Sequence, residues 1–168
     1  NTCWNAVDRH VEAGRGEQAA IIHDSPVTHT KREISYAELR DRVATLAGAL
    51  RARGVEKGDR VIIYRPMIPE AIEANLACAR IGAVHSVVFG GFSAEALRDR
   101  IRDCDAELVI TQDWGVRGGK KIPLKNVADE ACQGEASVKK MLVYKRTEDE
   151  CGWDDDRDVW WHDAVGAA

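Results

Sequence analysis

Apolar and polar positions alternate along the chain in a pattern that predicts strands and helices in turn. Four short apolar runs have the length and residue types of buried strands, at residues 60–64, 83–89, 107–111 and 140–144. Helices are predicted around and between them, at residues 36–53, 70–80, 94–104 and 124–132. In the first helix the apolar side chains recur every three or four residues, the spacing of one buried face. We therefore predict an α/β fold, a mostly parallel sheet with helices on both faces.

Capping residues mark the ends of the predicted helices. Ser35 and Glu38 form the S-x-x-E pattern, in which each side chain bonds a free amide at a helix start. Gly54 is placed to end that helix, and Pro69 lies in the first turn of the next one. Ser93 precedes the third helix as a cap.

The residues before the first long helix are expected to lie outside the main sheet. Residues 3–13 predict a helix that ends at the glycines following it, and residues 19–23 and 32–34 predict a small hairpin. The chain begins at Asn1 without a methionine, so we expect that the true N-terminus is missing. We expect residues 1–35 to be peripheral and residues 36–147 to form the βαβ layers.

The run at residues 83–89 organises the candidate chemistry. It is apolar on both faces, which predicts a strand in the middle of a parallel sheet. Gly90 and Gly91 follow it at a predicted strand end, where open α/β sheets bind ligands and helix starts receive anions. Because the chain holds neither G-x-G-x-x-G nor G-x-x-x-x-G-K-[ST], a purely structural turn is favoured for this segment taken alone.

A second glycine-rich loop follows the strand predicted at residues 107–111. Arg117, Lys120 and Lys121 flank Gly118 and Gly119, a composition suited to a phosphate ester because the glycines permit close approach. If the two strands are neighbours in the sheet, both loops lie at its carboxyl edge and could share a ligand. On composition alone, a solvated basic loop is an equal alternative.

Composition excludes several classes of partner. The formal net charge of −4 argues against nucleic-acid and anionic-membrane binding, which need an excess of Lys and Arg. No apolar run approaches the roughly 18 residues of a membrane span, so no membrane partner is expected. The five cysteines are scattered singly, which argues against disulfides and zinc and predicts a cytoplasmic setting.

No metal site or catalytic group is predicted from the residues themselves. Asp154, Asp155 and Asp156 match no calcium-loop spacing, so a solvated acidic loop is favoured. His85 and Ser86 are adjacent in a predicted strand and therefore point to opposite faces, which rules out a catalytic pair within the strand. We expect His85 to be a hydrogen-bonded core histidine.

Two long segments resemble a known family. Residues 64–70 (YRPMIPE) and 76–93 (LACARIGAVHSVVFGGFS) resemble the short-chain acyl-CoA synthetases, namely acetyl-CoA and propionyl-CoA synthetase, of the adenylate-forming enzymes. The resemblance continues at residues 8–10, 34–39, 115–123 and 158–162 and covers essentially the whole chain. Residues 24–28 and 55–61 look like the propionyl branch, whereas residues 92–93, 115–119 and 158–162 look like the acetyl branch. The acyl preference stays open.

The resemblance implies a reaction and a set of binding residues. A carboxylate, acetate or propionate, attacks the α-phosphate of Mg-ATP to give an acyl-adenylate, and the thiol of CoA then displaces AMP. The positions that match the family's contacts to the nucleotide end of CoA are Phe89, Gly90, Gly91, Arg117, Gly118, Gly119 and Lys120. Cations suit the phosphates, glycines allow close approach, and the aromatic ring suits the adenine.

Other parts of the family pattern have no match in this chain. They are the phosphate loop ending in Pro-Lys-Gly, the ATP-ribose motifs, the magnesium site and the C-terminal domain with the adenylation lysine. The resemblance therefore implies that residues 1–168 are an early part of the N-terminal AMP-binding domain of a longer ligase, unable to form an acyl-adenylate alone.

Two readings from other classes remain open. One is a non-catalytic CoA-binding or nucleotide-binding module, and the other is an inert structural piece. The sequence leaves the oligomeric state undetermined.

Three positions depart from the family pattern: Arg65 and Asn75 stand where methionine is usual, and Trp114 stands where an acidic residue is usual. A buried polar group without a partner costs about 1–3 kcal/mol, so Arg65 and Asn75 bear on core packing and Trp114 on the CoA loop.

Overall fold

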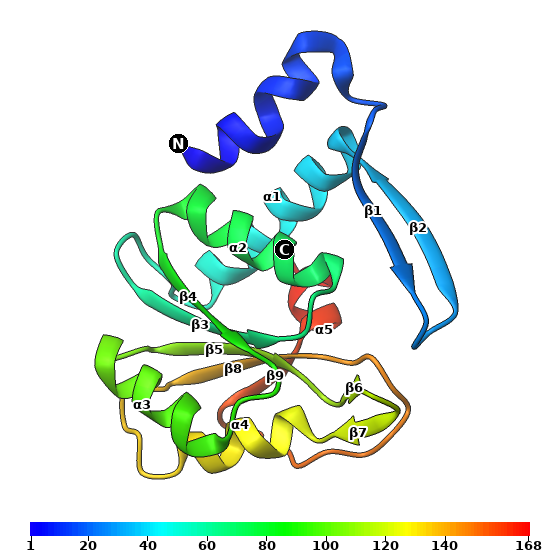
Figure 1. The fold of residues 1–168 in the computed structure, drawn as a ribbon. Helices are drawn as coiled ribbons and strands as arrows, with labels where there is room; N and C mark the ends of the chain where they lie inside the picture. Colours follow the sequence, from blue (N-terminus) through cyan, green and yellow to red (C-terminus); the bar gives the residue numbers. More distant parts are fainter.

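A five-stranded parallel sheet lies between two layers of helices in the computed structural model, which describes residues 1–168 (Figure 1). The strand order is β4-β3-β5-β8-β9, and every neighbouring pair is parallel. The strand bounds are β3 Arg60–Arg65, β4 Val84–Phe89, β5 Leu108–Gln112, β8 Lys140–Tyr144 and β9 Asp158–Trp160. The α/β fold predicted from the sequence is confirmed.

Helices cover both faces of the sheet. One face carries α1 Tyr36–Ala52, α2 Pro69–Ile81 and α5 Trp161–Gly166, and the other carries α3 Ala94–Cys104 and α4 Leu124–Cys132. Alternate residues of β3 serve the two cores: Ile63 packs on the α1 and α2 side, whereas Ile62 and Tyr64 pack on the α3 and α4 side. Burial on both faces explains why the sequence of this strand contains a continuous run of apolar residues. None of the helices has the length and apolar composition that crossing a lipid bilayer requires.

The N-terminal residues form a helix and a two-stranded hairpin that does not pair with the main sheet (Figure 1). The helix contains π-type turns at Trp4–Asp8 and Val11–Arg15, and two oxygens of Asp8 bind Arg80 of α2 at 2.7 and 2.8 Å. The hairpin pairs β1 Ala19–Ser25 antiparallel with β2 Thr30–Ser35.

Only half of the predicted capping box forms at the start of α1. The Ser35 hydroxyl accepts a hydrogen bond from the Glu38 amide at 3.2 Å. The Glu38 carboxylate binds Arg42 one turn further along, with its Nε at 3.0 Å, and makes no bond to the first free amide. A charged donor at the i+4 position competes with the neutral amide for that carboxylate, so this part of the prediction was wrong.

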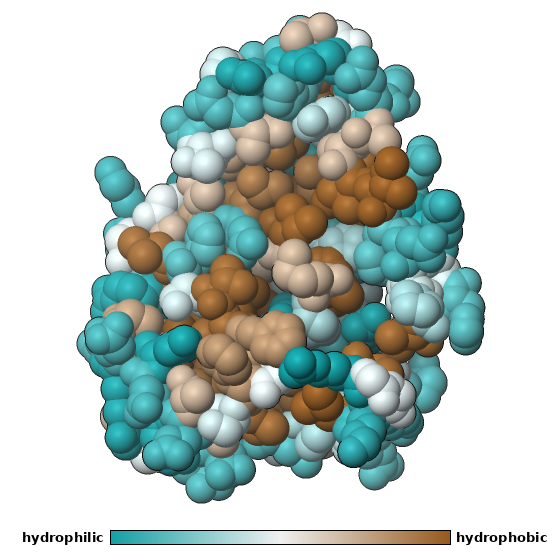
Figure 2. Space-filling model, viewed as in Figure 1, coloured by the Kyte–Doolittle hydropathy of each residue, from teal (hydrophilic) through white to brown (hydrophobic).

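The position of β4 in the sheet also differs from the prediction. Its apolar sequence predicted a central strand, but β4 lies at the sheet edge because the connection after it returns to the far side of β3. Val84, Val87 and Phe89 are therefore about half exposed, at 55%, 54% and 48%. Figure 2, drawn from the same side as Figure 1, shows hydrophobic residues gathered over the middle of that face. The period-two pattern identifies a strand and leaves its number of neighbours undetermined.

His85 does not behave as the predicted hydrogen-bonded core residue. It lies half-buried on the edge strand β4, and its ring forms no hydrogen bond within the chain. Burial lowers the pKa of this imidazole. The expectation was wrong because it assumed a central strand, where a polar ring would need a partner.

The short elements were missed by the sequence pattern. The three-residue strands β6 Gly115–Arg117 and β7 Lys120–Ile122 form a hairpin, and neither β9 nor α5 was predicted as an element. Three residues are too few to show an alternation, so only cross-strand pairing defines such strands.

Arg65 is buried at the carboxyl end of β3, with 3% of its surface exposed. Its guanidinium lies between the rings of Tyr144 and Trp161, at 4.8 and 4.9 Å from their centroids. All three of its nitrogens lack a hydrogen-bond partner, and burial lowers the pKa of the group to about 10. The Asn75 side-chain oxygen is also buried without a partner.

We expect Arg65→Met to raise the free energy of unfolding by about 1–2 kcal/mol. Methionine has a similar length and would fill the space between the two rings without a desolvated charge, and replacing buried charges by apolar groups of similar volume is often stabilising. Urea denaturation followed by circular dichroism measures the change. A variant that is less stable than the parent would show that the contacts with the two rings outweigh the desolvation cost.

Candidate functional site

The turn after β4 and the β6–β7 hairpin meet at the carboxyl edge of the sheet. The strand β3 separates β4 from β5, so the two strands are not neighbours, but all three are parallel and end on the same side. The two loops enclose a cavity of about 130 Å³. It is lined by Pro66, Phe89, Gly90, Gly115, Val116, Arg117, Ile122 and Leu124.

The turn after β4 is held close to the end of β3. The amides of Gly91 and Phe92 both donate to the Phe89 carbonyl, at 2.7 and 3.0 Å. The Tyr64 hydroxyl donates to the Phe92 carbonyl at 2.8 Å, and burial raises the pKa of Tyr64 to about 12, so it remains a donor at neutral pH. A Cβ at Gly90 would lie 3.1 Å from backbone atoms of β3 and the residue after it, so this close approach favours glycine.

Gly91 makes room for a contact between the two loops. The Arg117 guanidinium lies over the Phe89 ring, 5.0 Å from its centroid. A Cβ at Gly91 would stand 2.7 Å from the Phe89 ring and 2.8 Å from the Arg117 Nη1. A larger residue at this position would therefore push the arginine off the ring, so three of the predicted site residues form one packed unit.

The β6–β7 hairpin presents two unpaired cations. Gly118 and Gly119 form its two-residue turn with φ angles of 55° and 75°, values that glycine adopts without strain. The flanking residues Arg117 and Lys120 pair in the strand register, and both side chains are exposed without an ion pair. Lys121 differs, because its Nζ binds Asp149 at 2.6 Å.

A buried carboxylate, which the sequence did not reveal, anchors the start of the hairpin. Asp113 is fully buried directly after β5. Its oxygens accept from the amide of Trp114 at 2.6 Å, from the amide of Arg146 at 3.1 Å, and from the amide and hydroxyl of Thr147 at 2.8 and 3.0 Å. The carboxylate thereby joins the loop after β5 to the loop after β8. Only the fold brings the donors of Arg146 and Thr147 to Asp113, since they lie 33 and 34 residues further along the chain.

Two further aromatic positions bear on the site. Phe92 packs edge-on against Phe89, with ring centroids 6.1 Å apart, and the Arg100 guanidinium lies 5.2 Å from the Phe92 centroid. Arg100 was missed because it lies in the exposed face of α3, where a charged residue is ordinary. The Trp114 indole donates to the Glu150 carbonyl at 3.0 Å and does not line the cavity.

Together these groups form an anion-binding arrangement. The exposed cations Arg117 and Lys120 face solvent without a competing carboxylate, an aromatic pair offers a flat apolar surface, and glycine backbone permits close approach. A ligand with phosphates and a planar ring matches this combination. No residue of the arrangement is an evident nucleophile or general base.

Sequence comparison connects the chain to known proteins. The AMP-binding enzyme family matches residues 7–165. The acetyl-coenzyme A synthetase of Halorhodospira halophila (strain DSM 244 / SL1) is 58% identical over 168 residues, which are 100% of this chain and 26% of that protein. The acetyl-coenzyme A synthetase of Streptomyces avermitilis is 56% identical over 163 residues, covering 97% of this chain and 25% of that protein.

Comparison of structures agrees with the sequence comparison. An acetoacetyl-CoA synthetase from Streptomyces lividans superposes with a TM-score of 0.86 at 28% identity, covering 98% of this chain and 25% of that one. The chain therefore spans about a quarter of the length of the curated relatives and of the solved structure that it matches.

Proposed function

The chain belongs to the AMP-binding enzyme family, and from this premise we propose that it is the part of an ATP-dependent acetate or propionate–CoA ligase that holds the nucleotide end of CoA. In the whole ligase, a carboxylate and Mg-ATP form an acyl-adenylate and pyrophosphate, and CoA then takes the acyl group and releases AMP. The relatives named acetyl-coenzyme A synthetase support this reaction class.

The observation that carries the proposal is the contact between Arg117 and Phe89. It joins two loops that are distant in sequence and leaves a cation beside an aromatic ring and a glycine-lined cavity. CoA carries phosphates and an adenine, which match a cation and a ring respectively. We assign phosphate binding to Arg117 and Lys120, adenine packing to Phe89, and close backbone approach to Gly90, Gly91, Gly118 and Gly119.

The chain's proposed contribution to the reaction is binding and orientation. Holding the nucleotide end of CoA at the carboxyl edge of the sheet restricts the positions open to its thiol, which is the contribution of a binding residue to a later acyl transfer. We propose that acyl-adenylate formation requires parts of the ligase outside residues 1–168, because no group at this edge is suited to transfer a nucleotidyl group.

We expect Arg117→Ala to weaken CoA binding to this chain by about ten- to a hundredfold. A charge-assisted hydrogen bond contributes about 1.5–3 kcal/mol, and each 1.4 kcal/mol is a tenfold change in affinity. Isothermal titration calorimetry with CoA measures the effect. Lys121→Ala is the matched control in the same hairpin, because that charge is already neutralised by Asp149. Equal affinities for Arg117→Ala and the parent chain would refute the assigned site.

A second candidate function is a free-standing CoA-binding or nucleotide-binding module without catalysis. The contact between Arg117 and Phe89 favours this candidate, because both loops of the proposed CoA site lie within residues 1–168. Exchange of radiolabelled pyrophosphate into ATP in the presence of acetate or propionate distinguishes the candidates once the chain is combined with the remaining part of a related synthetase. Restored exchange supports the ligase part, whereas CoA binding without restored exchange supports the module.

A further inference from the structure

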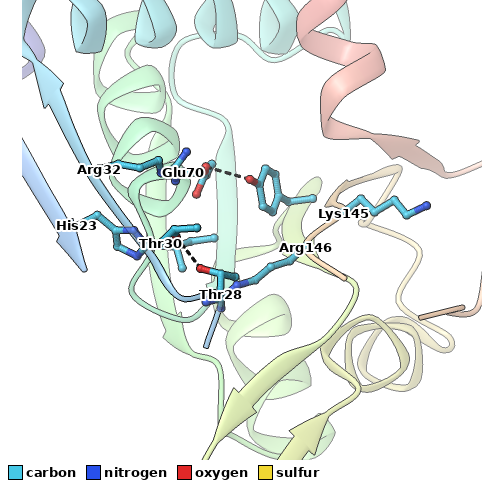
Figure 3. A pocket seen from close by; sticks show the side chains of 9 residues that line it. His23, Thr28, Thr30, Arg32, Glu70, Lys145 and Arg146 are labelled. Carbon is cyan, nitrogen blue, oxygen red and sulfur yellow. Dashed lines mark hydrogen bonds and ion pairs between the residues drawn. The ribbon is translucent and has the colours of Figure 1, made fainter. Parts of the chain in front are cut away.

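A separate cavity lies where the β1–β2 hairpin meets the start of α2 and the end of β8 (Figure 3). Its volume is about 200 Å³, and it is polar, with only two hydrophobic residues in its lining. It is lined by His23, Thr28, Thr30, Arg32, Ile68, Glu70, Tyr144, Lys145 and Arg146. None of these residues belongs to the proposed CoA site.

The one carboxylate in the cavity is already occupied. Glu70 lies in the first turn of α2, where it accepts a hydrogen bond from the Tyr144 hydroxyl at 3.0 Å and pairs with Arg32 at 3.3 Å. Burial alone would raise its pKa, but its own backbone amide, Tyr144 and the nearby arginines lower it overall. Glu70 and Arg32 therefore balance each other, and the carboxylate is not free to neutralise a further cation.

Arg146 is the cation left without a partner. Its guanidinium forms no ion pair and no hydrogen bond, and in Figure 3 its side chain extends toward Thr28. Its backbone amide is fixed by the buried Asp113 carboxylate at 3.1 Å, which sets where the side chain begins. Lys145 points away from the other side chains, and its Nζ lies 3.8 Å from a carboxylate oxygen of the exposed Glu148.

The hairpin side of the cavity supplies further groups. The hydroxyl oxygens of Thr28 and Thr30 lie 2.7 Å apart and share a hydrogen bond, so the two groups lie side by side in the lining of the cavity. The amide of Thr28 is held by the hydroxyl of the buried Ser25 at 3.2 Å. The Nδ1 atom of His23 is buried and has no hydrogen-bond partner.

We propose that this cavity is a second oxyanion site, which binds a phosphate group through Arg146 and the hydroxyls of Thr28 and Thr30. The guanidinium offers paired N–H donors in a planar fork that matches a phosphate, and the two hydroxyls turn to donate to it. The cavity volume of about 200 Å³ admits a phosphate group and leaves room for part of the molecule that carries it.

The site lies beside the β6–β7 hairpin without using its cations. Thr28 and Arg146 also line a neighbouring cavity of about 220 Å³, whose far side includes Val116 and Lys121 of the hairpin. Because Lys121 is paired with Asp149, the free positive charge between the two cavities belongs to Arg146. The phosphate group can therefore be that of the free ion or that of a nucleotide reaching along this edge.

Nuclear magnetic resonance titration of the 168-residue chain tests the proposal. Sodium phosphate is added at constant ionic strength against sodium chloride, and the amide signals of Thr28, Thr30 and Arg146 are followed. A second titration uses AMP, to distinguish a free phosphate from a nucleotide phosphate. We expect saturable shifts of these three signals in the parent chain. In Arg146→Gln the affinity for phosphate should fall by about tenfold or more, because a charge-assisted hydrogen bond is lost.

The control is Arg51→Gln, which removes one positive charge from the exposed side of α1, where Arg51 has no ion pair. It should bind phosphate as the parent does. If Arg146→Gln does not keep a dispersed spectrum, Thr30→Val serves instead, with a several-fold loss expected. Unchanged affinity in the folded variant, or shifts confined to Arg117 and Lys120, would overturn the proposal. Since CoA binding is tested at Arg117, its loss or retention leaves this result unaffected.

Discussion

Replacing Lys125 by methionine should lower the free energy of unfolding by about 3–5 kcal/mol, the usual cost of breaking a buried ion pair. The Lys125 side chain is fully buried at the start of α4. Its Nζ binds both oxygens of Asp129, at 2.6 and 2.8 Å, and the equally buried Asp158 of β9 at 2.7 Å. Methionine fills similar space, so the loss reflects the two carboxylates, which keep only Arg157 as a shared cation.

The effect should depend on pH. Burial alone would raise the pKa of Asp158, but Arg157 and Lys125 outweigh burial and hold the pKa below its ordinary value. A carboxylate with a lowered pKa in the folded state adds stability above its unfolded pKa of about 3.9, and this stability is lost as the pH falls through the folded pKa. The difference between parent and Lys125→Met should therefore shrink from pH 7 toward pH 3.

Urea denaturation at several pH values measures this prediction. Lys139→Met is the matched control, because Lys139 forms a 2.6 Å ion pair with Glu107 that is exposed to solvent, and exposed pairs contribute little. It should unfold at nearly the same urea concentration as the parent. Equal destabilisation by the two substitutions, or a difference independent of pH, would show that Lys125 acts through packing alone.

Asp113→Asn should destabilise the fold by at least about 3 kcal/mol and weaken CoA binding in the remaining folded protein. The carboxylate accepts four hydrogen bonds within a fully buried site, and bonds to a charged group contribute about 1.5–3 kcal/mol each. The asparagine side chain has no charge, and its NH2 group would face backbone amides that can only donate hydrogen bonds. The hairpin that carries Arg117 would then lose its anchor at residue 113.

Thermal unfolding and CoA calorimetry on the same samples separate these two effects. Asp103→Asn, on the exposed surface of α3, removes one negative charge without an ion pair and should change neither quantity appreciably. An Asp113→Asn protein with the stability of the parent would contradict the proposed anchor. A destabilised protein that binds CoA normally would show that the anchor serves the fold and leaves the hairpin in place.

Local sequence patterns were sufficient for the longer elements. The helix predicted at residues 94–104 has those bounds in α3, and the Ser93 hydroxyl accepts from the Ala96 amide at 3.3 Å. Its capping residue and its buried side chains interact within one or two turns, so neighbouring residues determine them. Both glycine turns were also identified. Gly118 and Gly119 adopt positive φ angles that other residues rarely adopt, whereas at Gly90 and Gly91 close neighbours leave no room for a side chain.

The neighbours of each element required the tertiary structure. β4 was predicted at the centre of the sheet and lies at its edge, since strand order depends on where each crossover returns. The sequence gives no sign that Lys125 is buried, and it indicates only one partner for this lysine, Asp129, four residues further along the helix. Its second partner, Asp158, follows 33 residues later. The division of the chain near residue 35 stays a prediction.

The sequence by itself determined the α/β class, the bounds of the helices α1 to α4 to within one residue, the positions of both glycine turns and the family resemblance. Each of these rests on residue types within a few positions of one another or on a run of matching residues. Only the tertiary structure decided that Arg117 lies over Phe89, that Asp113 anchors the hairpin, and that Arg146 faces a polar cavity without a partner. These contacts join loops from different strands, and their geometry depends on strand order and burial, which local interactions do not encode.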